Sequence, residues 1–334
     1  MLVAVLGALA AGAAGAGAQP VGSPPCGAST QSTVTAAYLA STMEIYGEEL
    51  DSPEVHDDLA HITAAADLAT AVANDDVAAT LAATTRIVYH PAWHIVRLRV
   101  ISSSGQVLAD VGGPSILAPV RGSITYHGGV VGSFVMSVQD DLGYEKLVTR
   151  FTALPIELYK GGKPLMGRDL PAADVPPRDP PNGTRMKVAG KAAISESYNV
   201  LAFPTGQTRV LIAVPPATAA LAQNSCAVVN GLTYGVISTD LAKLFKLPQD
   251  AQRYVDLNHA FDNQKLTFVR QGATQVASSD GQLGPTAIPT SGTVVYNGES
   301  WFVYSFVPTD PHLRVYLLFP LAPSTGTTGT SGST

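Results

Sequence analysis

Two arginines, Arg97 and Arg99, alternate with apolar residues in the run Ile95-Val-Arg-Leu-Arg-Val100. This alternation places both guanidinium groups on one face of a β-strand and the apolar side chains on the other. A guanidinium presents a planar fork of donors that suits a carboxylate or a phosphate. If this face lines a pocket, Arg97 is the natural clamp for an anionic ligand, with Asp110 and Tyr126 as companions near turns. An arginine pair on the surface of a sheet is the alternative.

The other groups that could do chemistry have simpler explanations. His90 and His94 have the four-residue spacing of metal ligands on a helix, but Pro91 between them breaks a helix. Asp140 and Asp141 follow an apolar run and precede a helical pattern, so we expect them to cap a helix. The sequence contains no Gly-x-Ser-x-Gly elbow, phosphate loop or Cys-x-x-Cys pair. We therefore expect no metal site, no cofactor and no enzyme activity.

The composition bounds the class of protein. The chain has 334 residues, of which 14% are charged, well below the roughly 25% of ordinary soluble chains. Its 31 glycines and 24 prolines fit many short strands and turns. The net charge of −6 and the absence of any Lys/Arg run argue against a nucleic-acid partner. The length allows two or three compact modules.

The chain begins with an apolar segment that ends in Ala16-Gly17-Ala18. Such a segment with a small-residue end predicts a secretory signal peptide over residues 1–18, and an uncleaved anchor helix is the alternative. Export would place the protein in an extracytoplasmic, oxidising compartment, secreted or associated with the cell envelope. There the two cysteines, Cys26 and Cys226, would most simply form one disulfide, with two unpaired thiols as the alternative.

The hydrophobic pattern predicts an α+β fold in which helices precede antiparallel sheets. Apolar residues at three- and four-residue steps predict long helices over the first part of residues 30–140, followed by a hairpin and further strands. A second set of strands over residues 141–216 and a third over residues 232–321 would follow the same order. Residues 322–334 are rich in Gly, Ser and Thr, which predicts a disordered tail.

Two stretches of the chain resemble each other. Ser197-Tyr-Asn-Val-Leu-Ala-Phe203 precedes Arg209-Val-Leu-Ile-Ala-Val-Pro215, and Ser300-Trp-Phe-Val-Tyr-Ser-Phe306 precedes Arg314-Val-Tyr-Leu-Leu-Phe-Pro320. A repeat at this period marks a structural unit used more than once. We interpret the stretches as the closing strands of two sibling sheets. Because Arg209 and Arg314 recur, a structural role such as an interstrand contact is favoured for both.

Two further motifs carry a resemblance to a known family. Gly128-Gly-Val-Val-Gly132-Ser-Phe-Val-Met-Ser137-Val-Gln-Asp140 is similar to the closing strand of a Cache module, the PAS-like extracytoplasmic sensor domain of bacterial receptors. Phe151-Thr-Ala-Leu-Pro155-Ile-Glu-Leu-Tyr-Lys-Gly161-Gly resembles the first hairpin of the next module in double-Cache ectodomains. The resemblance implies tandem antiparallel sheets with long N-terminal helices. The signature of amino-acid-binding members is absent, so amino acids are not favoured as ligands.

Together these observations predict an exported Cache-like sensor that binds a small polar or anionic molecule without catalysis. A membrane receptor or envelope component would be its partner, because the sequence shows no output domain. A structural or adhesive envelope protein with filled pockets is the alternative. The pattern leaves the ligand, the oligomeric state and the source organism open.

Overall fold

The computed structural model describes residues 29–165, 170–262, 265–280 and 287–321. The segment expected to be a signal peptide, Cys26 and the expected tail lie outside these residues. The described helices are α1 (Thr30–Asp51), α2 (Pro53–Ala64), α3 (Ala66–Ala73), α4 (Val77–Val88), α5 (Asp141–Thr152), α6 (Cys226–Ala242) and α7 (Ala251–Phe261). No helix in this part of the chain is long and apolar enough to cross a membrane.

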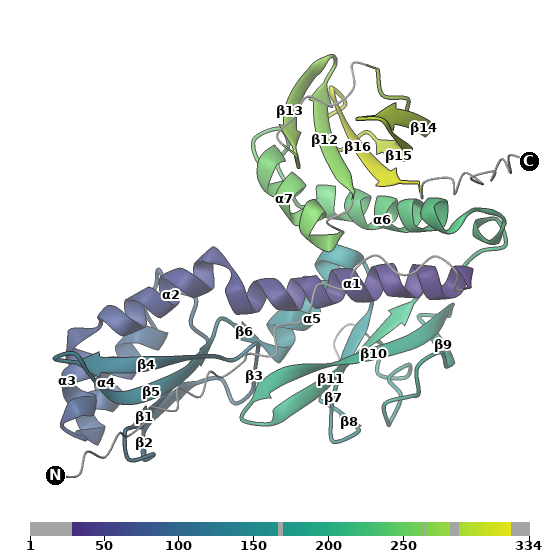
Figure 1. The fold of residues 1–334 in the computed structure, drawn as a ribbon. Coiled ribbons are helices and arrows are strands. Elements are labelled where there is room, and N and C mark those ends of the chain that lie inside the picture. Colours follow the sequence, from purple (N-terminus) through teal and green to yellow (C-terminus); the bar gives the residue numbers. More distant parts are fainter. Residues whose placement is uncertain (1–28, 166–169, 263–264, 281–286, 322–334) are drawn as a thin grey trace, which may run out of the picture.

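The strands form three antiparallel sheets, which confirms the predicted α+β class (Figure 1). The first sheet has the order β2-β1-β5-β4, the second β6-β3-β10-β11-β7-β8 with β9 beside β10, and the third β13-β12-β16-β15-β14. The strands of the first sheet are β1 (Arg97–Ser102), β2 (Val107–Gly112), β4 (Val120–Tyr126) and β5 (Gly129–Ser137). Those of the second are β3 (Ile116–Leu117), β6 (Gln139–Asp140), β7 (Ile156–Lys160), β8 (Lys163–Pro164), β9 (Arg185–Val188), β10 (Lys191–Phe203) and β11 (Gly206–Val214). Those of the third are β12 (Leu266–Gln271), β13 (Thr274–Ser278), β14 (Ser291–Tyr296), β15 (Glu299–Phe306) and β16 (Leu313–Pro320).

The three sheets share one topology. In each, a hairpin comes first and its first strand then pairs with the last strand of the unit, as β1 with β5, β7 with β11 and β12 with β16. This order confirms the predicted succession of helix, hairpin and further strands. The short strands β3 and β6 come from the same part of the sequence as the first sheet, but they pair within the second sheet. The division into modules over residues 30–140, 141–216 and 232–321 stays a prediction.

Several helix ends follow from local sequence. Ser52 caps α2 by accepting a hydrogen bond from the amide of Val55, and Pro53 occupies the first helical turn. Asp140 caps α5 through a 2.6 Å bond from the amide of Gly143, as predicted. The helices are more interrupted than the apolar pattern suggests: α2 and α3 are separated at Ala65, and α6 and α7 are separated by residues 243–250. Alanine-rich sequence supports either a continuous or a broken helix, so tertiary packing decides.

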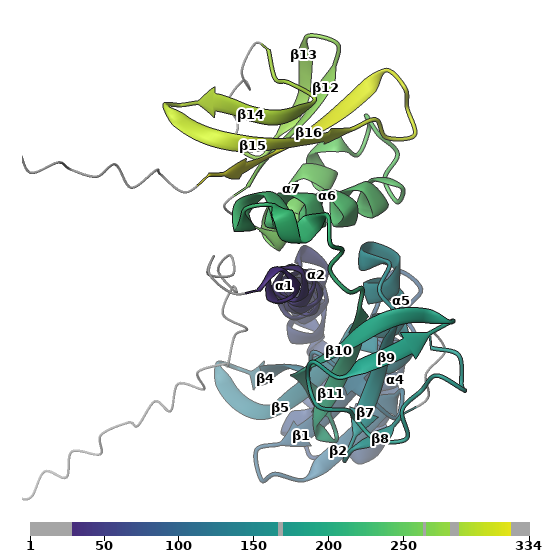
Figure 2. The same cartoon turned by 90° about the vertical axis from the view of Figure 1, so that its right-hand side faces the viewer.

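Helix α1 lies between two layers (Figures 1 and 2). The second sheet packs on one side of it, and α6 and α7, which cover the third sheet, lie on the other. One continuous apolar core joins these parts, with buried side chains such as Ile45, Tyr144, Val210, Tyr254 and Phe319. A separate core fills the space between α2–α4 and the first sheet. The long first helix therefore connects all three sheets.

The repeated stretches are the paired strands β10 and β11 and the paired strands β15 and β16, as expected, but their registers differ. Tyr198 lies opposite Val210 in the second sheet, whereas Trp301 lies opposite Pro320 and not Val315. The two registers are thus five residues apart, and an odd offset turns a side chain to the other face. Accordingly Tyr198 packs on the helical core and Trp301 on the opposite face of the third sheet. The strand pairs therefore recur, but residues at equivalent positions in the sequence repeat do not occupy equivalent positions in the two sheets.

The start of α6 lies against the start of α1. The Sγ atom of Cys226 is 3.8 Å from Oγ1 of Thr33 in the first turn of α1. The described chain begins at Ser29, three residues after Cys26. The first turn of α1 therefore lies near Cys226. The disulfide stays a prediction, because Cys26 lies outside the described residues.

Candidate functional site

Arg97 and Asp110 meet on neighbouring strands of the first sheet. Nε and Nη2 of Arg97 donate to the two carboxylate oxygens of Asp110, each at 2.8 Å. Nη1 donates to the carbonyl oxygens of Gly113, at 2.9 Å, and Pro114, at 2.6 Å. Leu98, between the arginines, is fully buried on the opposite face, as the alternation predicted. The donors of Arg97 are thus used within the chain, and an anionic ligand would have to displace Asp110.

A second arginine and an aromatic ring complete this cluster. Arg99 donates to Oδ2 of Asp110, and both guanidinium groups lie over the ring of Phe203, at 5.1 Å from its centroid for Arg97 and 4.4 Å for Arg99. Burial alone would raise the pKa of Asp110, but the hydrogen bonds and charges of the two arginines lower it overall. Since Phe203 ends β10, the cluster joins the first sheet to the second.

Tyr126 lies away from this cluster. It is opposite Gly129 at one end of the β4–β5 hairpin, whereas Arg97 is opposite Ser137 at the other end of β5. Eight residues of extended strand separate these ends by about 26 Å. The ring of Tyr126 instead packs on His127, with centroids 4.1 Å apart. The structure therefore brings together two of the three expected binding residues, and a binding role for Arg97, Asp110 and Tyr126 stays a prediction.

His90 and His94, which have the spacing of helical metal ligands, lie outside any helix. His90 and His94 follow the end of α4, and Trp93 stacks between the rings of His90 and His61 at centroid distances of 4.0 and 4.4 Å. Nδ1 of His94 is 3.0 Å from a carboxylate oxygen of Glu54. In the part of the chain that the structure describes, no group of three or more His, Cys, Asp or Glu residues is arranged to hold a metal ion.

Arg209 and Arg314 make the interstrand contacts that their recurrence predicted. Nε of Arg209, on β11, donates to Oγ of Ser197 on β10 at 3.0 Å and also pairs with Asp179. Nη1 of Arg314, on β16, donates to Oγ of Ser305 on β15 at 3.2 Å. Each arginine thus fastens the strand pair in which it lies.

A cleft of about 700 Å³ lies where the C-terminal end of α1 and the start of α2 meet α5 and α7. We call it the junction cleft. Carboxylates on two sides line it, from Glu48 and Glu49 on α1, Glu54 on α2 and Asp256 on α7. His94 and Arg253 are the lining side chains that can carry positive charge. With His94 neutral, four carboxylates face one guanidinium, a formal charge of −3.

Charge and burial act together on the carboxylates of the junction cleft. The pKa of Glu49 is raised to about 7, chiefly by burial and then by the negative charge of Glu54; His94 and a hydrogen bond with Gln139 oppose this. Burial and the charge of Asp51 raise the pKa of Glu48 as well. Burial is the main cause of both shifts, and neighbouring carboxylates add to it.

The other wall of the junction cleft is apolar. It consists of Leu147 and Phe151 on α5, Phe245 in the segment between α6 and α7, and Leu257 on α7, all of them partly buried. An apolar wall facing a few charged groups is the usual make-up of a small-molecule site, and the volume lies within the usual range of about 300–1,000 Å³.

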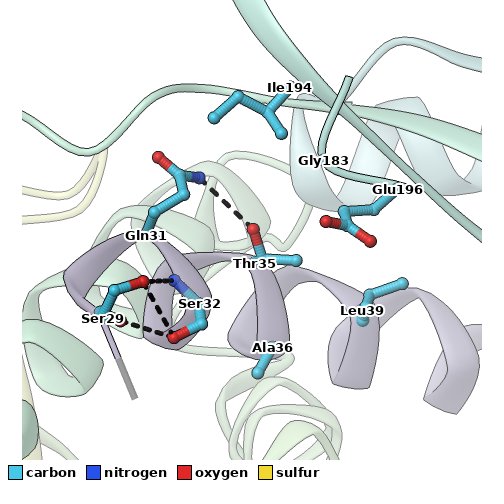
Figure 3. Close-up of a pocket in the computed structure, with 9 residues that line it drawn as sticks. All are labelled: Ser29, Gln31, Ser32, Thr35, Ala36, Leu39, Gly183, Ile194 and Glu196. Atoms are coloured by element: carbon cyan, nitrogen blue, oxygen red, sulfur yellow. Dashed lines mark hydrogen bonds between the residues drawn. The ribbon is translucent and has the colours of Figure 1, made fainter. Parts of the chain in front are cut away.

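A smaller pocket of about 380 Å³ lies at the start of α1, facing β10 (Figure 3). Its polar groups are mostly engaged with one another. Oγ of Ser29 accepts the amide of Ser32 at 3.2 Å, and the side-chain amide of Gln31 donates to Oγ1 of Thr35 at 3.3 Å and accepts the amide of Ala217 at 2.6 Å. Glu196 reaches into the same space from β10. These contacts cap and anchor the start of α1, so the junction cleft is the better candidate site.

The sequence pattern did not single out the junction cleft, because its walls come from four separated segments of the chain. One signal was present. Seven of the 26 acidic residues fall within residues 44–58, around the junction of α1 and α2. Such a concentration is ordinarily a solvated helical face, and only the packing of α5 and α7 beside it forms a cleft.

Comparison with known proteins finds similar solved structures but no matching sequence family. No protein-family model matches the sequence, and no curated protein matches it significantly. Among solved structures, the extracellular domain of the histidine kinase vpHK1S-Z8 matches with 12% identity and a TM-score of 0.33, over 55% of this chain and 95% of that one. The ligand-binding domain of the Pseudomonas fluorescens chemoreceptor CtaA, in complex with L-leucine, matches with 13% identity and a TM-score of 0.33, over 58% and 97%.

A third match is the ligand-binding domain of the Pseudomonas aeruginosa PAO1 chemoreceptor PctC, in complex with GABA, with 11% identity and a TM-score of 0.29 over 55% and 99% of the chains. These structures are extracellular sensor domains of the Cache-like kind that the sequence resembles. Identities and TM-scores of this size carry no argument about function, which has to come from the geometry of the chain itself.

Proposed function

We propose that this chain is an extracytoplasmic sensor or binding protein that captures a small polar molecule in the junction cleft without converting it. The observation that carries the proposal is the cleft itself, about 700 Å³ of space between an acidic and an apolar wall. A membrane receptor or envelope component would read out the bound state, and the export expected from the N-terminal sequence would place the protein outside the cytoplasm.

The position of the cleft supports a sensor role. Its walls are helices that pack on different sheets: α2 on the first sheet, α5 on the second, and α7 on the third. A ligand that contacts all of them changes the relative free energies of their arrangements, which is the physical requirement for a conformational response. A site inside a single sheet would not make this connection.

The lining groups do not form a catalytic arrangement that we can identify. Nucleophilic catalysis needs an activated nucleophile, such as a serine hydroxyl, within hydrogen-bond reach of a general base. Among the described lining residues, the imidazole of His94 pairs with the carboxylate of Glu54, and Ser52 is used as the N-cap of α2. Ligand capture requires no such arrangement and is the simpler proposal.

The alternative is a structural or adhesive envelope protein whose pockets are filled. The open junction cleft is the observation against it. An anionic ligand at Arg97, as the sequence suggested, is less well supported than a ligand in the cleft, because Asp110 and two backbone carbonyls already occupy that guanidinium.

A thermal-shift screen of amines, carboxylates and sugars on the full chain tests the proposal. A ligand at a hundred times its Kd stabilises the folded state by about 2.7 kcal/mol, so a member of the panel should raise the Tm by several degrees. Leu257→Trp, which fills the cleft from α7, should abolish the shift. Leu81→Trp, at a half-exposed leucine on α4, is the matched control and should keep it.

Two results would overturn the proposal. If no compound raises the Tm, the structural protein is favoured. If a compound raises the Tm equally in wild type and Leu257→Trp, the ligand binds elsewhere.

A further inference from the structure

More acidic than basic side chains line the junction cleft, and ion pairs do not balance the excess negative charge. In the described part of the chain, Glu48 and Glu49 belong to no ion pair, and Arg253 forms none with a lining carboxylate. Glu49 is hydrogen-bonded to the neutral amide of Gln139, which leaves its negative charge in place. The cleft therefore keeps an excess of negative charge next to a partly buried surface.

The apolar wall lies on the α5 and α7 side of the same space. Phe151 and Phe245 offer ring surface, and Leu147 and Leu257 offer aliphatic surface. Apolar surface that stays open to water is covered favourably by an apolar ligand group, at about 25 cal/mol per Å². One end of a matching ligand is thus apolar and the other end positively charged.

We infer that the junction cleft selects an amphipathic cation, a protonated amine on an apolar body, and that it discriminates against anions. This inference rests on the proposed function of the cleft and names its ligand class. The ammonium group would lie near Glu49 and Glu54, and the apolar body would cover Phe151 and Leu257. A carboxylate of similar size would instead face an excess of negative charge.

The ligand's charge should couple binding to proton release. Glu49 takes up a proton as the pH falls through about 7, whereas an aliphatic ammonium group stays charged over this range. The groups that face Glu49 are Glu48 on its own helix, Glu54, His94 and Gln139, with Arg253 and Asp256 across the cleft on α7. A cation favours the ionised form of Glu49, so the affinity should rise from pH 6 to pH 8 and binding at pH 6 should release protons.

Isothermal titration of the full chain with three isosteric probes tests the inference: 2-phenylethylamine, 2-phenylethanol and 3-phenylpropanoate. The amine should bind at least tenfold more tightly than the alcohol at pH 8, and the carboxylate more weakly than either. Glu49→Gln should weaken amine binding about tenfold and flatten its pH dependence. Asp57→Asn, which removes the same charge from an exposed position on α2, should leave the affinity unchanged.

Asp256→Asn, at an exposed position on α7, provides a second variant on a different helix from Glu49. It should also weaken amine binding while sparing the alcohol. If the alcohol or the carboxylate binds as tightly as the amine, and Leu257→Trp abolishes that binding, the charge preference is wrong while the cleft remains a ligand site. If none of the probes binds but an uncharged or anionic member of the thermal-shift panel does, the amine class is likewise overturned. Silence of every compound in both assays refutes the inference and the proposed function together.

Discussion

Arg97→Met removes the guanidinium but keeps most of the aliphatic volume of the side chain. Breaking one side of a buried ion pair costs about 3–5 kcal/mol. Here Asp110 is a quarter exposed and keeps Arg99 as a partner, which reduces the cost. The carbonyls of Gly113 and Pro114 also lose a donor, at about 1 kcal/mol each. We therefore expect Arg97→Met to lower the free energy of unfolding by about 3 kcal/mol.

The pH dependence of this loss follows from the pKa of Asp110. That pKa is lowered in the folded state, so the ion pair contributes fully above the unfolded value of about 4 and is lost as the pH falls through the lower folded value. The difference in unfolding free energy between wild type and Arg97→Met should be constant from pH 7 to pH 5. It should shrink below about pH 4, where Asp110 becomes protonated.

Urea unfolding followed by circular dichroism at several pH values measures both effects. Arg121→Met is the matched control, because Arg121 is an exposed arginine on β4 of the same sheet. If Arg97→Met destabilises the protein no more than Arg121→Met does, the guanidinium is not required by the fold. In that case it would be available to a ligand, and the structural interpretation of the cluster would be refuted.

Two further predictions concern the packing of α6. A Cβ at Gly235 would lie 2.7 Å from ring atoms of Tyr304, so Gly235→Ala should lower the unfolding free energy by about 1–3 kcal/mol despite the better helix propensity of alanine. Gly47→Ala on α1, where nothing lies within 4 Å of the added Cβ, is the control and should be neutral or stabilising. An equal effect of both substitutions on thermal unfolding would contradict the close approach of Gly235 to Tyr304. Thiol titration of the denatured, unreduced mature protein should find no reactive thiol if Cys26 and Cys226 are joined, whereas two reactive thiols would exclude the disulfide.

The parts of the fold that local sequence determines were predictable. Ser52-Pro53 and Asp140 start helices because capping depends on the residues themselves and their immediate neighbours. Alternation predicted the buried face of β1 correctly, since Leu98 and Val100 belong to the core. The residues that contact Arg97 and Arg99 on the opposite face of β1 were not predictable in this way. Asp110 comes from β2 and Phe203 from the second sheet, so only the assembled fold shows that they occupy Arg97 and Arg99.

The registers of the paired strands and the position of the junction cleft depend even more strongly on the assembled structure. Strand pairs β10–β11 and β15–β16 have similar sequences, yet a five-residue difference in register turns Tyr198 and Trp301 to opposite faces. Sequence similarity specifies that strands form and pair, while the turn and the packing of neighbouring helices select the register. The acidic stretch at residues 44–58 behaves in the same way, because it becomes one wall of a cleft only where α5 and α7 supply the other wall.

Under the proposed function, a ligand in the junction cleft would contact helices that pack on all three sheets. The sheet cores are filled with buried side chains. Helix α1 has 22 residues, about 33 Å of rigid structure, and its C-terminal end carries Glu48 and Glu49 into the cleft. The same helix packs against α6 and β10. A ligand that shifts the C-terminal end of α1 relative to α7 must shift these distant contacts as well, because a packed helix transmits displacement along its axis.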